Sequence, residues 1–160
     1  MTFAVTINLA CSWDNKMISA SEARRELIYL ACPYTHPDAK VRLYRFQQAT
    51  RAAAALIRQG HIVFSPITMT HPIDLEMAGA ESTLGSEFWV RFDETFMDRC
   101  DVFALLPLAG WQDSSGVGRE IAYFEAMGKP LKVLDQNYQL RAFELPLTGS
   151  QKEPPRKGAL

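Results

Sequence analysis

The sequence has few cysteines and histidines, and its glycines form no common nucleotide-binding motif. Several common kinds of functional site are therefore excluded. Three cysteines and three histidines occur in 160 residues, and no two cysteines form a CxxC pair. The odd cysteine count argues against a disulfide framework, and the spacing gives no zinc site. The glycines form neither a Gly-x-Gly-x-x-Gly dinucleotide fingerprint nor a phosphate-binding P-loop. We therefore predict a protein of a reducing, cytoplasmic environment without a bound metal.

Long apolar runs and an excess of one charge are also missing. No apolar stretch approaches the roughly 20 residues that span a bilayer, and the formal net charge is -1. No basic segment precedes the apolar N-terminal patch, as it would in a signal peptide. These absences argue against a membrane or nucleic-acid partner and against secretion. Basic residues do gather on one predicted helix, where a solvated face is the favoured interpretation. They are Lys40, Arg42, Arg45, Arg51 and Arg58.

Residues 110–130, GWQDSSGVGREIAYFEAMGKP, combine a loop, a helix and a helix stop. An apolar run at residues 101–106 precedes them and is typical of a strand buried on both faces of a parallel sheet. Residues 114–116 supply N-cap chemistry, and Gly128 ends the helix just before a proline. The loop is therefore predicted to leave the C-terminal end of a strand, where open parallel sheets bind their ligands.

The helix predicted at residues 117–127 has an apolar stripe with one carboxylate in it. Val117, Ile121 and Phe124 recur at helical spacing and are expected to face the sheet. Glu120 lies on the same stripe, so its carboxylate points toward the crevice above the strand ends. Buried carboxylates usually have a partner or a function. The alternative is an ordinary acidic residue that the helix dipole favours in the first turn.

The rest of the chain reads as alternating strands and helices. Strands are predicted at residues 27–31, 61–65, 101–106 and 131–134, and helices at residues 38–59, 86–99, 117–127 and 140–145. A long helix between the first two strands indicates the right-handed crossover of a parallel sheet. The prediction is therefore an α/β, flavodoxin-like (Rossmann-like) three-layer sandwich with a parallel central sheet.

Two further side chains are candidates from their settings. Residues 66–85 contain prolines, glycines and His71 without periodicity, which predicts a long lid or binding loop. A plain loop histidine is the alternative for His71. On the helix at residues 86–99, Asp93 lies at the edge of an aromatic stripe beside Trp89. Its carboxylate is either partly desolvated, with a raised pKa, or simply exposed at a boundary.

The domain prediction has three parts. Residues 1–24 form an N-terminal extension, which is either an extra strand or a non-native start. One hypothesis is that the native protein begins at Met17. Residues 25–145 form the α/β domain, and residues 146–160 form a mobile tail rich in Lys, Pro and Gly.

The order of three features resembles a known family. Tyr29 lies on the first strand, Asp93 on the helix before the third strand, and Ser114-x-Gly116-x-Gly-x-Glu120 opens the next helix. This order is similar to the nucleoside 2-deoxyribosyltransferase-like superfamily over residues 27–134. The superfamily includes deoxyribosyltransferases, 2′-deoxynucleoside 5′-phosphate N-hydrolases and CMP N-glycosidases. The chain also resembles uncharacterised bacterial and phage proteins with a Gly-Trp-x-x-Ser-x-Gly loop.

The resemblance implies a role for each matching residue. Glu120 takes the position of the nucleophile, Asp93 that of its acidic partner, and Tyr29 that of the residue positioning the nucleophile. Ser114 lies where the nucleotide hydrolases place a phosphate-binding serine and the transferases an aspartate, which favours a phosphorylated substrate. Backbone N–H groups of Ser115, Gly116 and Val117 add an expected anion site at the helix N-terminus.

Three other side chains are substrate-binding candidates. In the first loop the hydrolases typically have glycine, serine and arginine, whereas this chain offers only the hydroxyl of Thr35. Trp111 is expected either to stack on a base or to anchor its loop. His71 completes the set. The implied partners are a small nucleotide or nucleoside and further copies of the chain, because the family site is completed by a neighbouring subunit.

The implied chemistry is cleavage of a C1′–N bond. One carboxylate attacks or stabilises an oxocarbenium-like sugar, and a second acid protonates the departing base, so no metal or organic cofactor is needed. On this hypothesis Glu120 is the nucleophile, and Asp93 is either the general acid or an anchor for a sugar hydroxyl. Water releases the sugar in a hydrolase, and a second base accepts it in a transferase. The alternative from another class is a nucleotide-binding sensor without turnover.

Overall fold

Four parallel strands and one antiparallel strand form a sheet in the computed structural model, which describes residues 26–77 and 86–143. The spatial order is β2-β1-β3-β4-β5. The strands are β1 (Leu27–Ala31), β2 (Ile62–Phe64), β3 (Val102–Leu105), β4 (Leu131–Leu134) and β5 (Leu140–Ala142). The helices are α1 (Ala39–Arg58), α2 (Pro66–Met77), α3 (Ser86–Met97) and α4 (Ser115–Ala126). The expected extension at residues 1–24 and tail at residues 146–160 lie outside the described residues.

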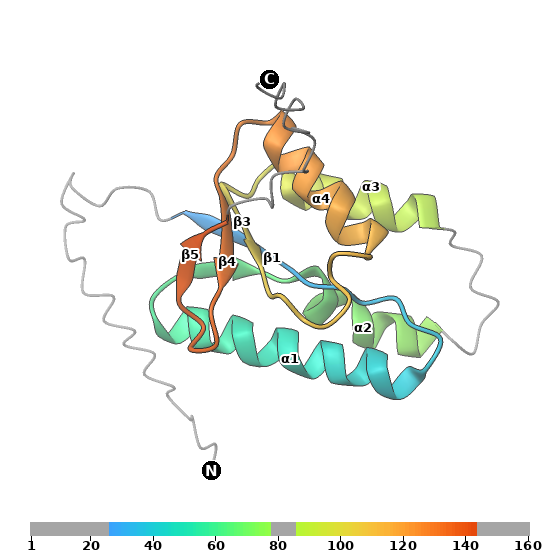
Figure 1. Ribbon diagram of the computed structural model, residues 1–160. Helices are drawn as coiled ribbons and strands as arrows, with labels where there is room; N and C mark the ends of the chain where they lie inside the picture. The colour runs from blue at the N-terminus through green and yellow to red at the C-terminus, as the bar shows by residue number, and fades with distance from the viewer. Residues whose placement is uncertain (1–25, 78–85, 144–160) are drawn as a thin grey trace, which may run out of the picture.

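Helices cover both faces of the sheet and enclose two apolar cores. On one face, Ala52 and Leu56 of α1 pack in a cluster with Ile28 and Leu30 of β1. On the other face, Tyr29 belongs to a cluster with side chains of α3 and α4. Successive residues of a strand point to opposite faces, so β1 supplies both cores. Figure 1 shows α1 below the sheet and α3 and α4 above it, which confirms the predicted three-layer α/β architecture.

The four predicted parallel strands are confirmed, with ends that differ by at most one residue. The long first helix is confirmed too, and its ends have the expected chemistry. Asp38 is the N-cap, and its Oδ1 accepts a hydrogen bond from the Lys40 N–H at 2.8 Å. Gly60 follows the C-cap with φ of 91°, a conformation that glycine adopts without steric cost. Within the described residues, no helix combines the length and apolar character needed to cross a membrane.

The prediction of a loop over residues 66–85 was wrong for its first part. Residues 66–77 form α2, and residues 78–85 lie outside the described part of the chain. Pro66 occupies the first helical position, where its missing N–H costs nothing. Besides the buried Ile67, this helix carries apolar residues at the exposed positions Met69, Ile73 and Leu75, so the sequence shows no single apolar face. The helix packs against α1 and β1, and these tertiary contacts are not visible in the local sequence.

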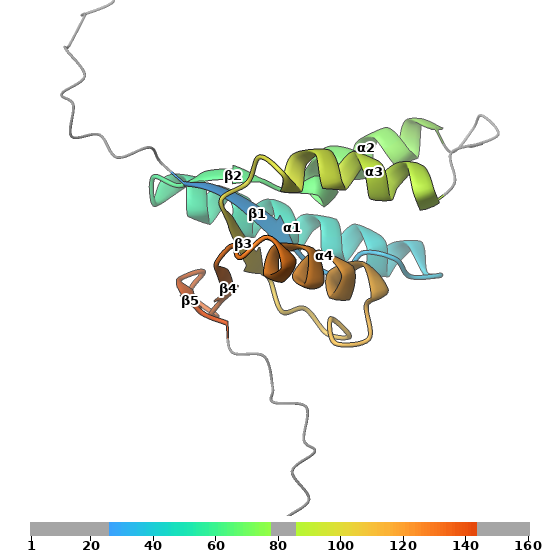
Figure 2. The same cartoon turned by 90° about the horizontal axis from the view of Figure 1, so that it is seen from above.

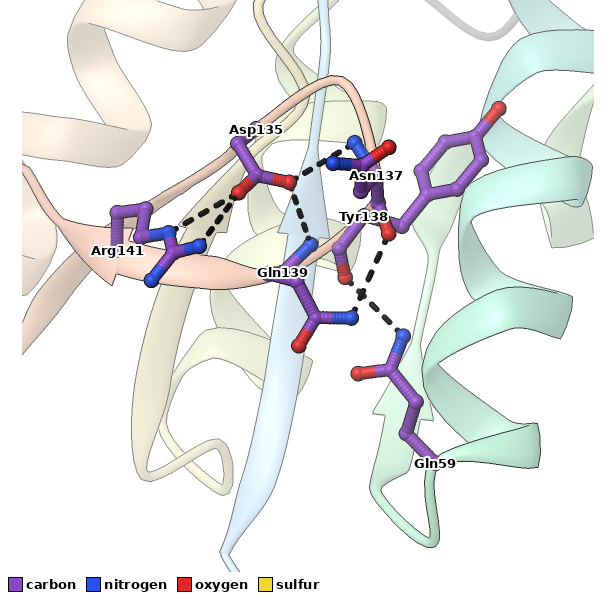
Figure 3. Close-up of polar contacts among 6 residues, drawn as sticks. All are labelled: Gln59, Asp135, Asn137, Tyr138, Gln139 and Arg141. Atoms are coloured by element: carbon purple, nitrogen blue, oxygen red, sulfur yellow. Dashed lines mark hydrogen bonds and ion pairs between the residues drawn. The ribbon is translucent and has the colours of Figure 1, made fainter.

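The short helix predicted at residues 140–145 was also wrong. Residues 140–142 form β5, which pairs antiparallel with β4 through Leu134 and Leu140. Figure 3 shows the turn between these strands, where Asp135 Oδ1 accepts from the N–H groups of Asn137 and Gln139, each at 2.9 Å. Tyr138 adopts a positive φ of 57° within the turn. The turn reverses the chain and presents residues 140–142 to the edge of β4, so strand pairing replaces a helix.

Candidate active site

A cavity of about 670 Å³ opens beyond the C-terminal ends of β1 and β3. Its walls come from the loops after these strands and from parts of all four helices. Five of the predicted site residues line it together with Glu120. They are Thr35, Asp93, Ser114, Ser115 and Gly116. Residues from three separate segments, the loop after β1, α3 and the start of α4, thus meet at the edge of the sheet where open α/β folds bind ligands. Within the described ranges, no group of three or more His, Cys, Asp and Glu side chains is placed to hold a metal ion.

Glu120 is one of the few charged side chains that the fold buries. It lies in the second turn of α4 and is only 8% exposed. The hydroxyl of Tyr29 donates a hydrogen bond to Glu120 Oε1 at 2.8 Å. Tyr29 does not line the cavity. Its fully buried ring packs against the rings of Phe103 and Phe124, and this packing fixes the direction of the hydroxyl.

Burial raises the pKa of two of the carboxyl groups in the cavity wall, those of Glu120 and Asp93. The pKa of Glu120 rises to about 8, chiefly through burial and further through the charge of Asp93, against lowering by the Tyr29 hydrogen bond and by Arg119. The pKa of Asp93 rises to about 6 because of burial, with Arg119 opposing the rise. Near neutral pH the two carboxyl groups therefore hold about one proton between them.

The N-terminus of α4 faces the same cavity. Ser114 is its N-cap, and its Oγ accepts a hydrogen bond from the Val117 N–H at 3.4 Å. The Val117 N–H, one of the three amides expected to bind an anion, is therefore used by the cap. The N–H groups of Ser115 and Gly116 remain as candidates for binding an anion. The helix dipole places partial positive charge at this end, which favours a negatively charged group.

Arg45 is a cavity residue that the sequence analysis assigned to a solvated helix face. Its Nη1 donates to the Thr35 carbonyl at 2.9 Å, and its Nη2 donates to the Ala109 carbonyl at 3.1 Å. The guanidinium therefore connects the loop after β1 to the loop after β3 while it lines the cavity. No local pattern in α1 distinguished Arg45 from its basic neighbours, because the contact with Ala109 spans 64 residues.

Two predicted substrate-binding residues are not among the cavity-lining residues. Trp111 packs edge-on against Phe143, with ring centroids 5.7 Å apart, so it ties its loop to the end of β5. His71 is buried on α2 and stacks on Phe46 with a centroid distance of 4.3 Å. Its Nδ1 contacts the hydroxyl of Tyr34, a cavity residue that the sequence analysis passed over.

The fold and the cavity together define a flavodoxin-like α/β protein with a buried carboxyl group at the ligand-binding edge of its sheet. The chain belongs to the family described as Domain of unknown function (DUF1937), whose model matches residues 26–136, more than half of the sequence. The match spans β1 to β4 and therefore includes every described residue that lines the cavity. No curated protein matches the chain.

Proposed function

We propose that the protein hydrolyses the N-glycosidic bond of a nucleoside 5′-monophosphate, with Glu120 as nucleophile. The observation that carries the proposal is the buried Tyr29 to Glu120 hydrogen bond beside the cavity. A carboxyl group taken out of water costs free energy unless it has a role or a full set of partners. The second carboxyl group, from Asp93, supports acid-base chemistry at the same site.

The proposed reaction begins from the form in which the pair holds one proton, on Asp93. This is the minor arrangement of that proton, because Glu120 has the higher pKa. The Glu120 carboxylate forms a bond to C1′ as the C1′–N bond breaks, and Asp93 gives its proton to the departing base. Asp93 then takes a proton from a water molecule whose oxygen bonds to C1′. The ester bond to Glu120 breaks, which releases the sugar phosphate and restores the original protonation of the pair.

The positive groups of the cavity support an anionic substrate. Amides at the start of α4, the Ser114 hydroxyl and the guanidinium of Arg45 all line it. A phosphate bound there would use charge-assisted hydrogen bonds, which are stronger than neutral ones. The protein would thus be a glycosidase of nucleotide metabolism.

We also propose that the protein is cytoplasmic and forms a homodimer or larger homo-oligomer. Exposed apolar side chains on the contacting helices α1 and α2 support self-association. They are Leu43, Tyr44, Met69 and Ile73.

The test is chromatography of free base after incubation with ribo- and deoxyribonucleosides and their 5′-monophosphates. We expect release from monophosphates, reduced roughly 10³-fold or more in Glu120→Gln. Glu125→Gln is the matched control, since Glu125 is exposed on the same helix and does not line the cavity. Release only with a second free base present would mean base transfer. Nucleotide binding without release from any substrate would contradict catalysis and indicate a sensor.

A further inference from the structure

Tyr34 and Asp74 form a second polar group in the wall of the cavity. Tyr34 comes from the loop after β1 and Asp74 from α2. Figure 2 shows α2 and α3 on one side of the molecule and α4 with its preceding loop on the other. The cavity therefore receives the N-terminus of α4 from one side, where Asp113 also lines it, and the Asp74 carboxylate from the α2 side. Burial raises the pKa of the Tyr34 hydroxyl, the negative charge of Asp74 raises it further, and the positive charge of Arg42 lowers it, so Tyr34 interacts with both charged side chains.

The hydroxyl of Tyr34 forms a hydrogen bond with the buried side chain of His71. Tyr34 Oη lies 2.6 Å from His71 Nδ1, and the two rings meet edge to face. The imidazole is 5% exposed and is fixed by stacking on Phe46. Among the described residues, none offers a hydrogen bond to the buried His71 Nε2.

The lone Nε2 indicates which atom of the Tyr34 to His71 pair carries the hydrogen. A neutral imidazole has one N–H and one bare nitrogen. A buried N–H without a partner is rarer than an under-used acceptor, because it forfeits a hydrogen bond to water. We therefore assign the proton to Nδ1, which donates to Tyr34 Oη. The hydrogen of the Tyr34 hydroxyl is then available to Asp74 or to a ligand in the cavity.

This assignment gives the Tyr34 and Asp74 pair one donor and two acceptors, and Thr70 of α2 adds a hydroxyl to the same wall. The donor is the Tyr34 hydroxyl, and the acceptors are the two oxygens of the Asp74 carboxylate. Among the common nucleobases, guanine presents the complementary edge, with O6 as acceptor beside the N1–H and N2–H donors. Adenine and cytosine present one donor group beside a bare ring nitrogen, and uracil and thymine present a single donor between two carbonyl oxygens.

We propose that Tyr34 and Asp74 recognise the base and select guanine, with His71 as a positioning residue for Tyr34. This inference rests on the proposed function, because it assumes that the cavity takes a nucleotide. Trp89 of α3 also lines the cavity and provides an aromatic surface for a purine ring. The phosphate would then lie on the α4 side, and the sugar between them, beside Glu120.

The test compares guanosine and inosine 5′-monophosphates and their deoxy forms, because inosine lacks only the 2-amino group. We expect kcat/KM for the guanine nucleotide to exceed that for the inosine nucleotide by roughly tenfold or more. In Asp74→Asn this ratio should fall to about one. Glu76→Gln is the matched control, since Glu76 is exposed on the same helix and does not line the cavity. Tyr34→Phe should weaken both substrates alike, because both carry O6, and should leave the ratio unchanged.

The positioning role of His71 has its own readout. His71→Asn retains a donor near the Nδ1 position and should keep the wild-type KM for the guanine nucleotide, whereas His71→Leu should raise KM as Tyr34→Phe does. A guanine-to-inosine ratio near one in the wild type, or an unchanged ratio in Asp74→Asn, overturns the inference.

Calorimetry with Glu120→Gln separates this inference from the proposed function. Tighter binding of the guanine nucleotide than of the inosine nucleotide, lost on adding Asp74→Asn, supports base recognition even if no base is released. Equal binding of the two nucleotides overturns base recognition even if the wild type is an active hydrolase.

Discussion

Tyr29 and Glu120 are 91 residues apart in the chain, yet a 2.8 Å hydrogen bond joins them in the interior. One comes from the interior strand β1 and the other from α4, which packs over that strand's face. The bond partly offsets the desolvation of the carboxyl group, since it favours the ionised form while burial opposes it. It therefore tunes the group that the proposed reaction needs in its ionised form.

Tyr29→Phe removes this hydrogen bond and should raise the pKa of Glu120 above its wild-type value of about 8. At neutral pH a smaller fraction of Glu120 would be ionised, so base release should fall by about 10-fold to 100-fold, as expected for loss of a hydrogen bond to a charged group. The rate of base release across pH measures both effects. An unchanged pH profile in Tyr29→Phe would show that the hydroxyl does not tune the carboxylate.

The two raised pKa values predict a bell-shaped pH dependence for kcat/KM. The active form holds one proton on the carboxyl pair, so activity should rise as pH passes about 6 and fall as it passes about 8. In Asp93→Asn the bell should be lost, because only Glu120 of the pair still titrates, and the remaining activity should rise as pH passes its pKa of about 8 instead of falling there. Steady-state rates between pH 5 and 9 test this. A profile that is flat from pH 5 to 9 contradicts it.

The pKa of Glu120 also predicts that the wild type loses stability as pH rises. Below the ordinary value of 4.5, Glu120 is neutral in both states and contributes no pH dependence. Between that value and about 8, the unfolded state releases the proton while the folded state keeps it, so unfolding becomes easier. Glu120→Gln should therefore stabilise the fold at pH 9 by up to about 5 kcal/mol, at about 1.36 kcal/mol per pKa unit.

Urea denaturation of the wild type and Glu120→Gln at pH 4.5 and pH 9 measures this difference. The advantage of the variant should be small at the lower pH and largest at the higher one. Glu125→Gln serves as the control, because the exposed Glu125 should show no such trend. A constant difference between the two pH values would mean that Glu120 is not desolvated.

Arg45→Met should weaken binding of nucleoside 5′-monophosphates by about 10-fold or more, as loss of a charge-assisted contact implies. Nucleosides without phosphate should be affected less. Arg45→Lys should not restore full affinity, because an ammonium cannot span the Thr35 and Ala109 carbonyls as a planar guanidinium does. The control is Arg51→Met, at an exposed position of the same helix. Equal losses for nucleoside and nucleotide in a binding titration would rule out a phosphate role.

Asp135→Ala should loosen the turn between β4 and β5. Asp135 accepts two backbone N–H groups and pairs with Arg141 at 2.9 Å, contacts that Figure 3 shows. Hydrogen bonds from Gln139 and Asn137 and the charge of Arg141 hold the pKa of Asp135 below its ordinary value. Its contribution is therefore present at neutral pH and is lost as pH falls through that lowered value.

The thermal midpoint and amide exchange at Gln139 measure the change in Asp135→Ala. The midpoint should fall and exchange should accelerate at pH 7. Gln136→Ala, at an exposed turn position, is the matched control. Equal exchange in wild type and Asp135→Ala would show that the carboxylate does not hold the turn.

Much of the fold was predictable because its signals are local. The strands at 27–31 and 131–134 and the capped helix at residues 39–58 follow from apolar runs and end chemistry. Two elements were not predictable in this way. The helix α2 lacks an apolar stripe, and β5 exists only because the turn at Asp135 brings it to the edge of β4.

Local sequence patterns were sufficient to predict the parallel α/β layering and to place Glu120 and Ser114 at the start of one helix. A helix repeat and an N-cap depend on neighbours a few residues away, so they can be read along the chain. The contacts of Tyr29 with Glu120 and of Arg45 with Ala109 emerge only when the chain is folded. They span 91 and 64 residues, and they depend on how helices pack on the sheet, which no local pattern encodes.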